Sequence, residues 1–130
     1  MKYYFNTILK NLTFDEAIAR VIHELKNEGF GILTEIDIQS IFNIKLQVDF
    51  YNYKILGACH ASFAYKALQV EDKIGTMLPC NVIVQEREKG VIEVSVVDPS
   101  ASMASVENKA LVIIAEQIRV KLKKIIKNLE

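Results

Sequence analysis

The chain has 130 residues, of which 51% are hydrophobic and 25% are charged. This composition fits one globular domain over residues 1–130 and excludes collagen-like, coiled-coil and disordered chains. Its 16 basic and 16 acidic residues cancel, so no overall field draws the protein to nucleic acid or to an acidic membrane surface. We therefore expect no nucleic-acid partner and no membrane partner.

The first half of the chain carries the clearest helix signal. Aromatic and β-branched residues over 3–9 predict a first strand. Thr13 and Glu16 then form a capping box, and apolar residues recur at helical spacing as far as Leu25. Gly29 favours the left-handed stop just past a last helical turn. The pattern predicts a strand followed by an amphipathic helix.

A second strand and a shorter helix follow. Residues 30–36 are rich in β-formers, and Asp37 can cap a helix that begins after it. If the strand continued through Asp37 instead, Glu35 and Asp37 would form an acidic pair on one face. The capped helix predicts an inward face made of Ile38, Ile41, Phe42 and Leu46.

The rest of the chain predicts two helices around a hairpin. A strand over 51–58 leads to a helix just beyond Cys59 and His60. Two apolar, β-branched runs with Lys89 and Gly90 between them predict a β-hairpin. Asp98 and Pro99 then begin a helical turn, and an apolar stripe from about Asn108 onward predicts a long C-terminal helix.

This order of elements predicts an α+β fold in the form of a two-layer sandwich. We expect a mixed, mainly antiparallel sheet with the long C-terminal helix packed on one main face. Three early helical connections allow some parallel strand pairs, so a doubly wound arrangement is the alternative. The N-terminus holds too short an apolar run for a signal peptide, and two cysteines 21 residues apart favour reduced thiols. We expect a cytoplasmic protein.

Cys59 is the most interesting single residue. At a strand-to-helix junction the helix N-terminus could favour its thiolate, or Cys59 could be a small buried apolar side chain. Gly57 before it allows either a ligand or an overlying helix to approach closely. His60 could act as an acid, a base or a ligand if the turn begins between the two residues, and otherwise lies at the surface.

A second candidate cluster begins at the next strand. Core packing is the default role of Cys80, and Asn81 either closes a turn or presents its amide to a ligand. The sequence contains no metal-binding spacing, no nucleotide fingerprint and no nucleophile motif. We therefore predict no catalytic residue and no metal, and the sequence identifies no cofactor.

Four strings in order resemble the family of domains of unknown function 302: residues 29–37, 55–59, 78–82 and 97–99. The resemblance implies a small prokaryotic α+β protein without an assigned activity. It also implies a homodimer and an architecture similar to the TATA-box-binding protein, although a shared fold does not carry DNA binding with it.

The resemblance implies a pocket near the strand ends. Its recurrent positions are Gly57, Cys59, Pro79, Cys80, Asn81 and Asp98. This chain has His60-Ala61 where family members usually have Asn-Pro. With His60 added and Pro79 left out, the candidate ligand-binding residues are Gly57, Cys59, His60, Cys80, Asn81 and Asp98.

Three functions compete at this point. The first is a homodimeric module that binds a small ligand or cofactor without chemistry. The second is a structural dimer that binds nothing. The third is a thiol-based redox enzyme or sensor that uses Cys59, with Cys80 as a resolving partner if the sulfurs come within bridging distance.

Overall fold

Five strands form one sheet in the computed structural model, which describes residues 2–130. The strands lie in the order β1-β5-β4-β3-β2, and each neighbouring pair is antiparallel. Their bounds are Tyr4–Lys10 (β1), Gly31–Asp37 (β2), Asn52–Cys59 (β3), Cys80–Glu88 (β4) and Val91–Val97 (β5).

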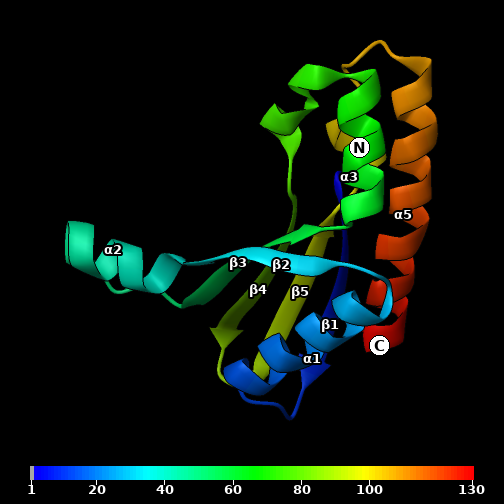
Figure 1. Cartoon of the computed structure of the whole chain (residues 1–130). Coiled ribbons are helices and arrows are strands. Elements are labelled where there is room, and N and C mark those ends of the chain that lie inside the picture. Colours follow the sequence, from blue (N-terminus) through cyan, green and yellow to red (C-terminus); the bar gives the residue numbers. More distant parts are fainter. Residues whose placement is uncertain (1) are drawn as a thin grey trace.

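Three helices cover one face of this sheet, as Figure 1 shows. They are α1 (Phe14–Asn27), α3 (Ala61–Val70) and the long α5 (Lys109–Leu129). Two short elements complete the covering layer, the 3-10 helix η1 (Asp72–Met77) and α4 (Pro99–Ser102). The predicted α+β sandwich with a long C-terminal helix is confirmed. None of the helices described has the length and apolar character needed to cross a membrane.

The expected parallel strand pairs do not occur in the described sheet. β2 and β3 flank α2 (Ile38–Leu46), and β3 and β4 flank α3, yet both strand pairs are antiparallel. In each case the next strand begins at the end of the sheet where the previous strand stopped, so it runs in the opposite direction. α1 does link two strands of the same direction, but β1 and β2 lie at opposite edges and do not pair.

The core lies between the helices and the covered face of the sheet. Alternate strand residues point into it, so Val82 and Val84 of β4 are buried beside Leu56 of β3 and Val94 of β5. The largest side chains that are fully buried come from sheet and helices alike: Leu25, Phe30, Leu56, Ile74, Ile92, Leu111, Leu122, Ile125 and Leu129.

Side-chain caps begin the helices where the sequence predicts them. Thr13 Oγ1 accepts a bond from the Glu16 N–H at 3.1 Å, and Glu16 Oε1 accepts one from the Thr13 N–H at 2.9 Å. Asp37 caps α2 through the Ser40 N–H at 3.0 Å, so it serves as a cap and not as half of an acidic pair. Asn108 caps α5 in the same way.

The predicted inward face of α2 is wrong. No residue of α2 is buried, and Leu46, expected to face the core, is 63% exposed. Figure 1 shows α2 at the tip of an arm made with β2 and β3, away from the other helices. Phe42 packs on Phe50 at 5.1 Å between ring centroids, which is local support within the arm. The helical spacing was present, but the core lies elsewhere.

Candidate functional site

Three of the predicted residues, Cys59, His60 and Cys80, line a small cavity between the sheet and the helices. The cavity has a volume of about 20 Å³, which is close to the space of one water molecule. Its lining is almost entirely apolar and includes Phe30, Met103 and Ile118. This cavity is too small for an organic ligand.

The two thiols differ in their surroundings. Burial raises the pKa of the Cys80 thiol to about 11, and the neighbouring Cys59 adds to that rise. Cys80 is therefore a core residue held in its thiol form, as its default role predicts. Its partner across the strand pair is Ala58, so the two cysteines are not direct cross-strand neighbours. Both are free thiols.

His60 is packed among aromatic rings. Its ring lies edge-on to Phe30 at 5.4 Å and against Phe63 at 4.5 Å. A Cβ on Gly29 would meet His60 Nε2 at 2.7 Å, so the imidazole also fits closely against that glycine. His60 Nδ1 is buried without a hydrogen-bond partner among residues 2–130. Burial lowers the pKa of His60, and Lys121 lowers it further.

This environment differs from the surface position expected for His60. α3 begins directly after His60, which makes the residue an N-cap, but its side chain forms no capping hydrogen bond. The ring turns instead toward Phe30, which precedes β2. His60 is a packing residue that favours the neutral form.

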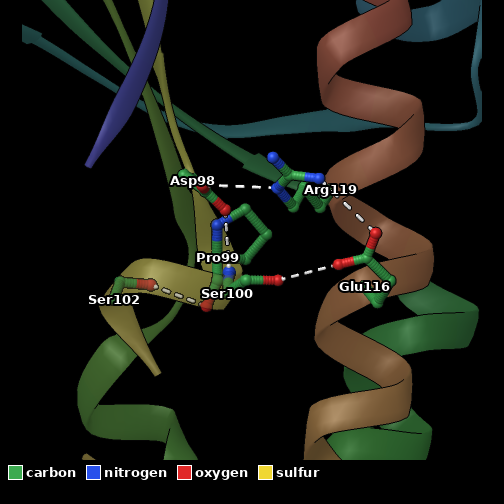
Figure 2. Close-up of polar contacts among 6 residues, drawn as sticks. All are labelled: Asp98, Pro99, Ser100, Ser102, Glu116 and Arg119. Atoms are coloured by element: carbon green, nitrogen blue, oxygen red, sulfur yellow. Dashed lines mark hydrogen bonds and ion pairs between the residues drawn. The ribbon is translucent and has the colours of Figure 1, made fainter. Parts of the chain in front are cut away.

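Asp98 belongs to a polar network that joins the end of β5 to α5, shown in Figure 2. One carboxylate oxygen accepts a bond from the Ser100 N–H at 3.0 Å, and the other accepts one from Arg119 Nε at 3.3 Å. Arg119 also pairs with Glu116 at 3.5 Å, and Pro99 occupies the first position of α4. Both oxygens of Asp98 are used within the fold, so its role here is structural.

Gly57 and Asn81 lie on the other face of the sheet, which no helix covers. They are cross-strand partners in β3 and β4. A Cβ on Gly57 would collide with the Thr34 hydroxyl and would lie 2.8 Å from Pro79 Cγ. The absence of a side chain at Gly57 thus lets β3 approach Thr34 of β2 and Pro79 closely. The Asn81 side chain is exposed and closes no turn. The structure does not bring Asn81 together with the thiols.

A much larger hollow occupies this open face. It has a volume of about 740 Å³, and four of the five tyrosines of the chain line it. Tyr3 and Tyr4 come from the β1 edge, and Tyr51 and Tyr53 come from the β3 side. We call it the tyrosine hollow. Its remaining lining consists of Asn6, Asn81, Ile83, Gln85, Arg87, Glu93, Ser95, Val96 and Val97.

Polar groups form the floor of the tyrosine hollow. Gln85 is 7% exposed, and its Nε2 donates to the Tyr51 hydroxyl at a long 3.4 Å. Ser95, which is 6% exposed, accepts a bond from Asn6 Nδ2 at 2.7 Å. The same amide donates to Glu93 at 2.9 Å. A sheet face turned away from the core therefore holds buried side chains with hydrogen-bonding capacity.

Arg87 provides a positive charge at this hollow. Its guanidinium lies 5.5 Å from the centroid of the Tyr51 ring, a cation–π contact. Within residues 2–130, Arg87 forms no ion pair. Burial raises the pKa of Tyr53, nearby Tyr51 and Tyr3 add to the rise, and Arg87 opposes it.

Asn81 is the only predicted candidate that lines the tyrosine hollow. The other lining residues could have been grouped by the two-residue period of strands. By that period, Tyr51 and Tyr53 share one face, and so do Asn81 and Gln85. That period gives the face of each strand, but not which strands are neighbours. In the part of the chain that the structure describes, no group of three or more metal-ligating residues was found.

The comparisons with known proteins agree on a family and a fold. The family described as "Domain of unknown function DUF302" matches residues 5–129. A crystal structure of an uncharacterized conserved DUF302 protein from Bacillus stearothermophilus resembles this chain with a TM-score of 0.90 and 24% sequence identity. The similarity covers 100% of both chains. None of the curated proteins matches the sequence significantly.

Proposed function

The chain belongs to the family of domains of unknown function DUF302, and we propose that it binds a small ligand in the tyrosine hollow. The observation that carries this proposal is the gathering of four of the five tyrosines around one hollow of about 740 Å³. This volume falls within the range of small-molecule sites. Tyrosine is favoured at recognition surfaces because its ring is rigid and its hydroxyl can form hydrogen bonds.

The construction of the floor supports the same proposal. Strands β4 and β5 form the floor, and the helical layer backs them on the covered face, so the floor is rigid. Gln85 and Ser95 present polar atoms from low-exposure positions on that floor. Sites of this type bind by combining aromatic walls with a few fixed polar groups.

We propose binding without a chemical step. Cys80 and His60, which could in principle serve as nucleophile or base, line the small apolar cavity and not the tyrosine hollow. The raised pKa of Cys80 and the lowered pKa of His60 both favour the uncharged forms. A thiol enzyme or sensor would have to use Cys59, so it is the weaker alternative.

A homodimer is the second part of the proposal. Apolar side chains on the α2 arm support it, since Ile44 is 70% exposed and Leu46 is 63% exposed. A short helix that exposes Ile41, Ile44 and Leu46 leaves apolar surface that one copy of the chain does not cover. A dimer that serves only structure is the alternative function, and these same residues favour it.

Architecture and location complete the proposal. Helices on one face of the sheet and an uncovered second face support an arrangement similar to that of the TATA-box-binding protein. The balanced charge of the chain argues against nucleic acid as the occupant of the open face. Two free cysteines favour a cytoplasmic location.

A ligand screen by thermal shift, with hits confirmed by native mass spectrometry, tests the binding proposal. Asn81→Phe should fill part of the tyrosine hollow and abolish the shifts caused by true ligands. Asn81 is exposed, so the variant is expected to fold. Gln69→Phe on α3 places the same ring on the helical layer and should leave every shift unchanged. Hits that survive Asn81→Phe and respond to Gln69→Phe would move the site to the helical layer.

A further inference from the structure

We infer that the ligand of the tyrosine hollow is a planar aromatic compound that carries an anionic group. This inference rests on the proposed function and adds the chemical class of the ligand. Three features of the hollow carry it: the placement of its rings, the amide and hydroxyl groups of its floor, and the charge of Arg87.

The tyrosines stand on two opposite sides of the hollow. Tyr4 is on β1 and Tyr53 is on β3, with β5 and β4 between them. Three strand spacings separate these sides by about 14 Å. A flat ring system can contact aromatic walls on both sides, whereas a round aliphatic ligand would contact them poorly.

The floor matches the edge of a heteroaromatic ring. Asn81 and Gln85 each offer an amide donor and an acceptor, and they lie on the same face of β4. Gln85 makes one long bond to Tyr51, which leaves it free to exchange that bond for a better one. Four residues of strand separate their Cα atoms by about 13 Å, so the two amides can bond different parts of an extended ring system. Its ring nitrogens and carbonyls present donors and acceptors in one plane.

Arg87 supplies the reason for an anionic group. A guanidinium binds a carboxylate or phosphate through two parallel hydrogen bonds, and no carboxylate of residues 2–130 forms an ion pair with Arg87. Its place over Tyr51 would put the anion beside the aromatic wall. Glu93 is the acid of the lining, and its carboxylate already accepts a bond from Asn6. A neutral ring would leave Arg87 unused, and a bare anion would leave the tyrosines unused.

Two matched pairs of compounds test the ligand class by isothermal titration calorimetry on the full chain. Adenosine is compared with adenosine monophosphate, and riboflavin with flavin mononucleotide, so each pair differs only by a phosphate. We expect at least one of the two phosphate esters to bind, about tenfold or more tightly than its neutral parent. Inorganic phosphate alone should not bind. The side-chain amide NMR signals of Asn81 and Gln85 should shift with the bound ester.

Charge removal provides the matched control. Arg87→Gln should remove the preference for the phosphate ester over its neutral parent. Lys89→Gln, at the tip of the same hairpin and outside the lining, should leave the preference intact. Equal effects of the two variants, or binding of neither ester, would overturn the ligand class.

The failure of this inference can be separated from the failure of the proposed function. If the screened ligands are aliphatic or uncharged and lose binding in Asn81→Phe, the tyrosine hollow remains the site and only the ligand class falls. If nothing binds and Arg87→Gln or Asn81→Phe turns a dimer into a monomer in sedimentation, a second copy of the chain occupies the hollow. That outcome would overturn both.

Discussion

The two faces of the sheet are built from alternate residues of the same strands, yet they differ in almost every property. On β4, Val82 and Val84 point toward the helices and are at most 2% exposed, whereas Asn81 and Gln85 point into the tyrosine hollow. The covered face is a hydrocarbon surface whose shape the helices must match. The open face has no helix to match, so its side chains can serve recognition without weakening the core.

The largest expected effect tests this contrast with two neighbouring residues of β3. Leu56 is fully buried under the helices, and Ile55 is half-buried on the open face. Leu56→Ala should lower the free energy of unfolding by about 2–5 kcal/mol, because it removes buried contacts and leaves a cavity. Ile55→Ala should cost clearly less, since water already reaches its side chain. Urea unfolding of both variants measures the difference, and equal losses would contradict the contrast.

Gly57 should be the exception on the open face. Gly57→Ala puts a methyl group against Thr34 and the Pro79 ring, and the ring has little freedom to move. We expect a loss of about 1–3 kcal/mol, the range for overpacking. Urea unfolding measures it.

Gly31 on the adjacent strand is the matched control for that substitution. A Cβ there would meet nothing within 4 Å. Gly31→Ala should therefore be neutral or slightly stabilising, because it mainly restricts the unfolded chain. If the two alanines had the same effect, close packing would not be the role of Gly57.

These positions also show what local sequence patterns can and cannot predict. Caps such as Thr13 and Asp37 act through neighbours in the chain, so the helix starts were predicted correctly. Cys80 was predicted as a core residue because core packing is the default role of a free cysteine at the start of a strand, and it is 6% exposed. Local rules suffice wherever the partner lies within a few residues.

The tyrosine hollow depends on partners that are far apart in the chain. Tyr4 and Tyr53 lie on opposite sides of β5 and β4, and only the strand order places them around one hollow. The same limit explains α2, whose apolar spacing is real but whose position on the arm takes it away from the core. It also explains His60, because part of its environment comes from Gly29 and Phe30, about thirty residues earlier.

His60 offers the smallest effect, and a pH-dependent one. Burial first and Lys121 second lower its pKa in the folded protein, and its Nδ1 has no acceptor for an added proton among the described residues. The unfolded chain takes up that proton near pH 6.5, the ordinary value for histidine, while the folded chain resists it. The unfolded state therefore binds more protons below about pH 6.5, so stability should fall as the pH falls through that value. His60→Gln should flatten this decline in urea unfolding between about pH 7.5 and pH 5.5.

His23 is exposed on α1, so His23→Gln should leave the decline in place. A decline that persists in His60→Gln and disappears in His23→Gln would show that the packed imidazole on the covered face is not the group that senses pH.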